Sequence, residues 1–137
     1  MRIRLSLVLL GWLGLAGCDL SATYAPATAD LENKHVHDGD AARGFSLVAS
    51  GSYGCAACHA IPGIRTPKGV AGPPLAGMAR RGFIAGQLPN KPGVMVAFLQ
   101  DPPALLATTG MPNVGLTLDE ARDVAAYLYT LEQPDAE

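Results

Sequence analysis

Apolar residues recur at helical spacing in the last third of the chain. Thr117 and Glu120 stand at the start of this stretch with the spacing of a capping box. The apolar positions that follow lie three or four residues apart: Ala121, Val124, Ala125, Leu128 and Leu131. Pro134 lies beyond them, where a helix can no longer continue. The pattern predicts a helix that starts after Thr117 and presents one apolar face.

Two further helices are predicted upstream. Asp38 or Asp40 can cap a helix over roughly residues 40–50. Pro92 can open another helix, because the first helical position needs no backbone N–H donor. Residues 60–91 between them contain glycine and proline too densely for regular elements. We therefore expect an all-α domain of four or five helices, with no sheet and with one long loop.

The segment after the first helix carries a haem-attachment motif, Cys55-Ala56-Ala57-Cys58-His59. In an exported chain this spacing predicts thioether bonds from Cys55 and Cys58 to one c-type haem, with His59 as a ligand of the iron. Residues three and four apart share one face of a helical turn, so the three side chains can project together. The long loop then wraps around the flat cofactor.

Three other interpretations of the cysteine pair remain. A thioredoxin-like redox pair normally lies within a βαβ pattern, and the sequence has no such pattern. A zinc site requires a second Cys/His pair at ligand spacing, and the sequence contains no such pair after Cys58. A disulfide between residues three apart would close a very small loop. The motif therefore favours one covalently attached haem c.

The N-terminus has the layout of an export signal. Arg2 and Arg4 precede an apolar run from Leu5 to Leu15 that is too short for a confident transmembrane span. The run ends in Leu15-Ala16-Gly17-Cys18, which resembles the lipobox of bacterial lipoproteins. That resemblance implies cleavage before Cys18 and lipidation of its thiol; an ordinary secretory signal is the alternative.

The lipobox defines the expected organisation of the chain. We expect a lipoprotein signal peptide over residues 1–17, a lipidated N-terminus and flexible tether over residues 18–38, and one domain over residues 39–137. Several acyl chains hold a protein firmly at a bilayer that it does not span. Asp19 resembles an inner-membrane retention signal. We therefore expect the domain on the periplasmic side of a bacterial membrane, anchored by lipid to the inner membrane.

The net charge of −2 hides an uneven distribution. Residues 41–100 contain six basic residues and no acidic one, whereas residues 101–137 contain seven acidic residues and only Arg122 as a base. A basic rim near the haem would steer a redox partner that has an acidic docking face. A mixed, solvated surface is the alternative. Nucleic acid is not an expected partner of a net-acidic exported domain.

Met111 is the expected second axial ligand of the iron. It lies in Gly110-Met111-Pro112, where the glycine permits close approach of the backbone and the proline stiffens an extended segment. A thioether favours ferrous iron and therefore raises the reduction potential. Two axial ligands also leave no open position for oxygen or peroxide, which suits electron transfer.

The other candidate ligands have simpler interpretations. Met95 shares an apolar helical face with Phe98 and Leu99, so it is expected to pack in the core. Met78 follows the proline-rich loop and is expected to pack at the haem edge. His35 and His37 lie in the expected tether and should be solvated.

Residues Gly39–Leu131 resemble the class I, mitochondrial-type cytochromes c with a single haem. The resemblance rests on the haem motif and on three short segments: Gly72-Pro73-Pro74-Leu75, Met111-Pro112 and Ala126-Tyr127-Leu128. It implies the small class I cytochrome c fold, in which four to five helices wrap around one covalently attached haem.

The resemblance also implies roles for single residues. The carbonyl of Pro73 would accept a hydrogen bond from the second ring nitrogen of His59. Arg81 would help hold a haem propionate, and Phe98 would lie near the methionine ligand. The first and last helices would cross, with Gly44 allowing close approach.

Together these features predict an electron carrier and not an enzyme. The protein would pass single electrons from a quinol-oxidising or dehydrogenase complex to a terminal acceptor such as a haem–copper oxidase, with no small-molecule substrate. One alternative is a cytochrome c subunit bound permanently in an oxidase or dehydrogenase complex. Another is a gas-sensing or peroxidase-like haem protein with an open iron site.

Overall fold

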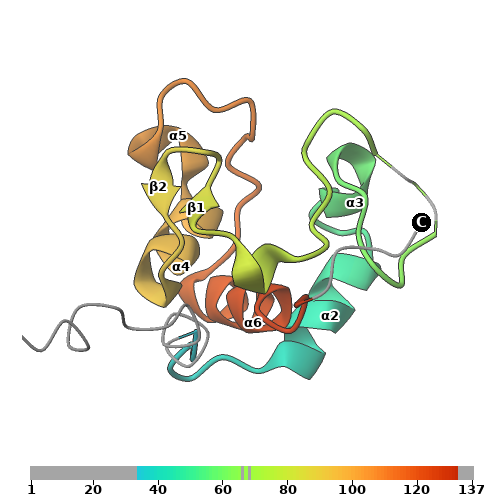
Figure 1. Cartoon of the computed structure of the whole chain (residues 1–137). Helices are drawn as coiled ribbons and strands as arrows, with labels where there is room; N and C mark the ends of the chain where they lie inside the picture. Colours follow the sequence, from blue (N-terminus) through green and yellow to red (C-terminus); the bar gives the residue numbers. More distant parts are fainter. Residues whose placement is uncertain (1–33, 66, 68, 133–137) are drawn as a thin grey trace, which may run out of the picture.

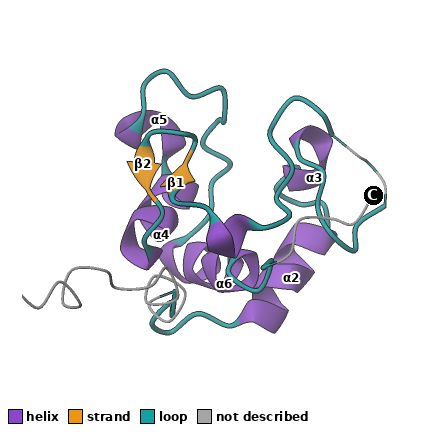
Figure 2. Ribbon diagram, viewed as in Figure 1, coloured by secondary structure: helices purple, strands orange, loops and turns teal. Residues whose placement is uncertain are grey.

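A computed structural model describes residues 34–65, 67 and 69–132. The predictions that concern the signal peptide, Cys18 and most of the tether lie outside these residues. Within them, the structure contains five α-helices: α2 (Ala41–Ala49), α3 (Cys55–Cys58), α4 (Pro92–Gln100), α5 (Pro102–Leu105) and α6 (Leu118–Leu128) (Figure 1). Loops make up most of the chain between α3 and α4, as the density of glycine and proline predicts (Figure 2). None of the described helices is long and apolar enough to cross a bilayer.

The starts of three helices agree with the sequence prediction. Asp40 is the N-cap of α2, and its carboxylate accepts hydrogen bonds from two backbone N–H groups of the first turn. Pro92 is the first residue of α4. The capping box between Thr117 and Glu120 is complete at the start of α6. The last helix is shorter than its apolar pattern suggests, because α6 ends at Leu128 and a turn carries the chain onward.

The expectation of a fold without any sheet is wrong in one detail. Strands β1 (Phe83–Ile84) and β2 (Leu88–Pro89) pair antiparallel, with Phe83 opposite Pro89 and Ile84 opposite Leu88. Ala85 and Gly86 in the turn both have positive φ, at 49° and 72°, and the Gln87 N–H donates to the Ile84 carbonyl at 3.1 Å. A type I′ turn requires this geometry. Strands of two residues are too short to give a recognisable alternating pattern.

The core is centred on the crossing of α2 and α6, which lie side by side in Figure 1. Gly44 stands at the crossing: a Cβ atom there would lie 2.0 Å from the Asp123 carbonyl oxygen and 2.9 Å from the Tyr127 Cβ. The close approach expected at Gly44 is therefore present. Met95, which is 1% exposed, packs in the core as predicted from its helical face.

A second set of contacts joins the N-terminal part of the described chain to the domain. Val36, within the expected tether, is a buried core residue. The Lys34 ammonium donates to the Asn90 carbonyl and lies 5.1 Å from the centre of the Tyr129 ring. His37 is 89% exposed and its Nδ1 atom lies 2.7 Å from the Asp38 carboxylate, which agrees with the expected solvation. The chain therefore joins the folded domain beside β2 and the start of α4.

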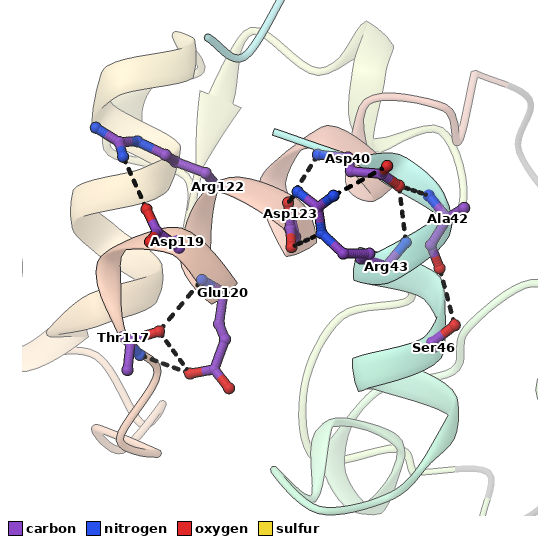
Figure 3. A network of polar contacts seen from close by, with 9 residues as sticks. All are labelled: Asp40, Ala42, Arg43, Ser46, Thr117, Asp119, Glu120, Arg122 and Asp123. Atoms are coloured by element: carbon purple, nitrogen blue, oxygen red, sulfur yellow. Dashed lines mark hydrogen bonds and ion pairs between the residues drawn. The ribbon is translucent and has the colours of Figure 1, made fainter. Parts of the chain in front are cut away.

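Polar contacts reinforce the helix crossing (Figure 3). The Asp123 carboxylate is buried and accepts from Arg43 at 2.7 Å (Nε) and 2.9 Å (Nη2). It also accepts from the backbone N–H of Asp40 at 2.7 Å. These bonds fix the start of α2 against the middle of α6, so the crossing is held by charge-assisted hydrogen bonds as well as by close packing.

The Arg43–Asp123 pair predicts a loss of stability in acid. Hydrogen bonding by Arg43 holds the pKa of the Asp123 carboxyl below its ordinary value. The bonds therefore stabilise the fold above the pKa of an unfolded-state aspartate, about 3.9, and this contribution is lost as the pH falls through the lower folded-state pKa. Measured from pH 7 down to pH 2, the free energy of unfolding should fall less steeply in Asp123→Asn than in the unmodified protein. Asp119→Asn, at a carboxylate 88% exposed, is the control and should keep the original slope.

Candidate functional site

The cysteine pair forms the first and last residues of a single helical turn. Helix α3 runs from Cys55 to Cys58, and Gly54 before it adopts the left-handed conformation, with φ 66°. His59 caps the turn, and its N–H donates to the Cys55 carbonyl at 2.9 Å. Both cysteines are free thiols; Cys58 is exposed and Cys55 is half-buried. The structure therefore brings the three residues of the motif together, with no disulfide between the cysteines.

The orientation of the His59 ring is set by a hydrogen bond to the backbone. Its Nδ1 atom lies 2.7 Å from the Pro73 carbonyl oxygen, which is the bond that the resemblance implies. Because a carbonyl oxygen can only accept, Nδ1 must carry the proton. In the neutral ring, Nε2 then keeps its lone pair and is able to bind a metal.

Two glycines let the segment after the motif pack directly against it. A Cβ at Gly72 would lie 2.4 Å from His59 Cε1, and a Cβ at Gly69 would lie 2.3 Å from the Cys58 carbonyl carbon. The N–H groups of these glycines donate to α3, Gly72 to the Cys58 carbonyl at 2.8 Å and Gly69 to the Ala56 carbonyl at 2.9 Å. The sequence marked Gly72 only as part of Gly72-Pro73-Pro74-Leu75, one of the segments of the family resemblance. It gave no comparable signal for Gly69, one of many glycines in that loop.

A tyrosine two residues before the motif ties it to the last helix. The Tyr53 hydroxyl donates to the Glu120 carboxylate at 2.6 Å, and the same carboxylate completes the capping box of α6. This contact was not predicted, because it joins residues far apart in the sequence. It fixes the turn of α3 relative to the α2–α6 core.

The remaining predicted site residues come from the other half of the domain. Met111 is half-buried on the loop between α5 and α6, where its N–H donates to the Thr109 hydroxyl at 3.2 Å. Phe98 is buried on α4. In the view of Figure 1, α3 lies on one side of the molecule and α4 and α5 lie on the other, with α6 below both groups.

Arg81 contacts the proline-rich segment next to His59. Its Nη2 atom donates to the carbonyl of Pro74, and to that of Ala76 at 3.0 Å. The guanidinium has five N–H donors. Both of the side-chain hydrogen bonds that Arg81 makes to described residues come from Nη2. The contact holds residues 74–76 in place beside the ring of His59.

The environment of the thiols does not suit the other interpretations of the cysteine pair. Burial raises the pKa of the Cys55 thiol, and the neighbouring Cys58 adds to this effect. A redox-active pair instead needs a thiol with a lowered pKa. The described residues also contain no group of three or more His, Cys, Asp or Glu side chains that could hold a metal ion. A zinc centre and a thioredoxin-like site are therefore both disfavoured.

The donor set fits a covalently attached haem. Two free thiols three residues apart are followed by an imidazole whose Nε2 is available, and Met111 offers a thioether from the opposite half of the domain. Fold and donor set thus define a small helical domain of the haem c-binding class.

Comparison with known families agrees with this class. The family model for Cytochrome c matches residues 41–132, which is more than half of the chain. The chain belongs to the cytochrome c family, and the helices and small two-stranded sheet of its described residues are consistent with class I members. No curated protein and no solved structure matches the chain. Membership of the family indicates a haem-based electron-transfer protein, as predicted at this level.

Gly72 provides a test of the packing around His59. In Gly72→Ala, the new methyl group would overlap the imidazole, so the ring must move away from the Pro73 carbonyl. We expect the free energy of unfolding to fall by about 1–3 kcal/mol. The slowly exchanging Nδ1–H signal of His59 should also be lost from the ¹⁵N NMR spectrum. Gly82→Ala is the control, because a Cβ there meets nothing within 4 Å. If both variants keep the NMR signal and the stability of the parent protein, Gly72 does not pack against the His59 ring.

Proposed function

We propose that this protein is a membrane-tethered periplasmic electron carrier with one haem c. Cys55 and Cys58 would form the thioether bonds, and His59 and Met111 would be the axial ligands. When bound, the haem supplies an iron that changes its oxidation state by one electron. The observation that carries the proposal is the hydrogen bond from His59 Nδ1 to the Pro73 carbonyl, because it leaves Nε2 ready for a metal beside two free thiols.

The chain's own residues would keep the metal centre rigid. The bond to the Pro73 carbonyl holds the His59 ring in one orientation and keeps the proton on Nδ1. Arg81 holds the neighbouring carbonyls with one of its two terminal amino groups, so its other donors can bind a propionate. Phe98 would pack near Met111 from the buried face of α4. A rigid site suits electron transfer, because the ligands need not move when the charge changes.

The exposed surface beside α3 would meet the redox partner. Val70 is 93% exposed, and Cys58 and Ala57 in α3 are exposed as well. Arg65 is an exposed base on the same loop. An apolar centre with a basic neighbour suits a partner with an acidic docking face, and charge of this kind raises the rate of association.

The membrane anchor, the location and the redox partners are proposed from the sequence. Lipid on Cys18 would hold the protein at the periplasmic side of the inner membrane. The donor would be a quinol-oxidising or dehydrogenase complex, and the acceptor a terminal enzyme such as a haem–copper oxidase. A fixed subunit of such a complex is the second candidate, since the same tether would serve it. Size-exclusion chromatography of a detergent extract at high salt separates the two, because only a fixed subunit elutes in a larger complex.

Optical spectroscopy of the purified protein tests the haem site. A pyridine haemochrome assay should give one haem c per chain. The ferric spectrum should contain the weak red-edge band of a thioether-bound iron, and the ferrous protein should not bind carbon monoxide readily. A protein without haem, or one whose iron takes up carbon monoxide freely, would refute the proposal. The latter result would favour a gas-sensing or peroxidase-like protein.

A further inference from the structure

The β1–β2 hairpin exposes an aromatic side chain that the core does not use. Phe83 is 59% exposed, although its neighbour Ile84 is buried at 3%. Phe83 stands directly opposite Pro89, which is also exposed. Because side chains alternate between the two faces of a strand, Phe83 and Pro89 share the outer face of the hairpin. We refer to Phe83, Pro89 and the exposed bases Arg80 and Lys91 as the hairpin surface.

The two bases flank the apolar pair on the same stretch of chain. Lys91 follows two residues after Pro89 in extended backbone, with φ −116° and ψ 149°. The chain turns tightly at the buried Asn90, where the Lys91 N–H donates to the Pro89 carbonyl at 2.8 Å, and Lys91 itself is exposed next to the hairpin. Arg80 is exposed three residues before Phe83. Residues 41–100 contain no acidic side chain, so every charged residue close to the hairpin surface in the sequence is a base.

The chain joins the domain beside this surface. Lys34 donates to the carbonyl of Asn90, and the N–H of Asn90 donates to the Gly82 carbonyl at 2.9 Å, which extends the pairing of the hairpin. Lys34 follows Cys18 by sixteen positions, and the flexible tether expected from the sequence would typically span about 22 Å over that length. A membrane anchor at Cys18 would therefore keep the hairpin surface close to the lipid.

We propose that the hairpin surface is a second membrane contact, in which Phe83 inserts among the headgroups of anionic lipids and Arg80 and Lys91 bind their charges. The proposal rests on the proposed location of the protein at a membrane. Aromatic and basic residues together are the combination that binds the interface of an anionic bilayer. In Figure 1 the hairpin and α4 lie on the side of the molecule away from α3. The contact would therefore turn the Cys55–Cys58 turn away from the bilayer, toward a soluble or protruding partner.

Vesicle binding of the holoprotein without its lipid tests this contact separately from the anchor. Holoprotein that begins at residue 18 with Ser in place of Cys18, exported by a secretory signal that is cleaved off, lacks both the lipid and the apolar run of residues 5–15. It should co-sediment with vesicles that contain phosphatidylglycerol, and should bind much less to vesicles of phosphatidylcholine alone or at high salt. Phe83→Ser should weaken binding by about tenfold, and Lys91→Gln by about fivefold. Val70→Ser is the control: it removes an apolar side chain beside α3 that is more exposed than Phe83, at 93%, and should leave binding unchanged.

Four results would overturn the proposal. Equal binding by Phe83→Ser and the parent protein would exclude insertion at the hairpin. A changed visible spectrum in Phe83→Ser would assign this ring to the haem site instead. A dimer that forms with rising concentration and is lost in Phe83→Ser would show that the surface meets a second copy of the chain. A normal haem spectrum without vesicle binding would refute only the second contact and leave the proposed electron carrier intact.

Discussion

Replacing Met111 by alanine should convert the holoprotein from a closed to an open haem site. The unmodified protein should give a low-spin spectrum with a thioether band, and Met111→Ala should lose that band and bind carbon monoxide when reduced. Loss of the thioether also removes a ligand that favours ferrous iron. The midpoint potential should then fall by a sizeable part of the roughly 0.8 V range over which axial ligands set haem potentials.

Met95 supplies the matched control for this substitution. It is the same type of residue, but it lies on the buried face of α4, where it is 1% exposed and packs in the core. Met95→Leu nearly conserves volume and should lower the free energy of unfolding by less than about 1.5 kcal/mol. Its visible spectrum and potential should match those of the parent protein. If Met95→Leu loses the thioether band while Met111→Ala keeps it, the two methionines have been assigned in the wrong order.

The features that the sequence predicted well are those encoded by neighbouring residues. Asp40 and Thr117 bond to backbone groups within the next three positions, so each helix start could be recognised without a tertiary fold. The Cys55–His59 motif likewise forms one turn. The hydrogen bond from His59 to Pro73 is different, because it was inferred from the family resemblance and not from local physics.

The contacts that could not be predicted join residues distant in the sequence. Asn90 is the clearest case: its side-chain NH₂ donates to the carbonyls of Met78 and Arg81, both at 2.8 Å, and its side-chain oxygen accepts from the Tyr129 hydroxyl at 2.9 Å. Nothing in the local sequence distinguishes this asparagine from one in a solvated loop. Its partners are determined by how the hairpin folds back onto α6, and that depends on the packing of the whole domain.

Gly44→Ala offers the strongest test of the helix crossing, because two physical effects change its free energy of unfolding in opposite directions. Alanine is favoured over glycine within a helix by about 1 kcal/mol, so propensity alone would make Gly44→Ala more stable. Against this, the new Cβ would lie 2.0 Å from the Asp123 carbonyl oxygen, which is backbone and cannot rotate away. Overpacking of a core typically costs about 1–3 kcal/mol, and more where neither side can move.

We therefore expect the clash to dominate, with a net fall of about 2 kcal/mol or more in the free energy of unfolding of Gly44→Ala. Separation of α2 from α6 would also lengthen the bonds from Arg43 to Asp123, so the acid-dependent part of the stability should shrink in the same variant. Gly93→Ala in α4 is the control, since a Cβ there meets nothing within 4 Å. It should leave the stability unchanged or raise it by up to about 1 kcal/mol. Equal stability of the two variants in denaturant unfolding would mean that the helices do not cross at Gly44.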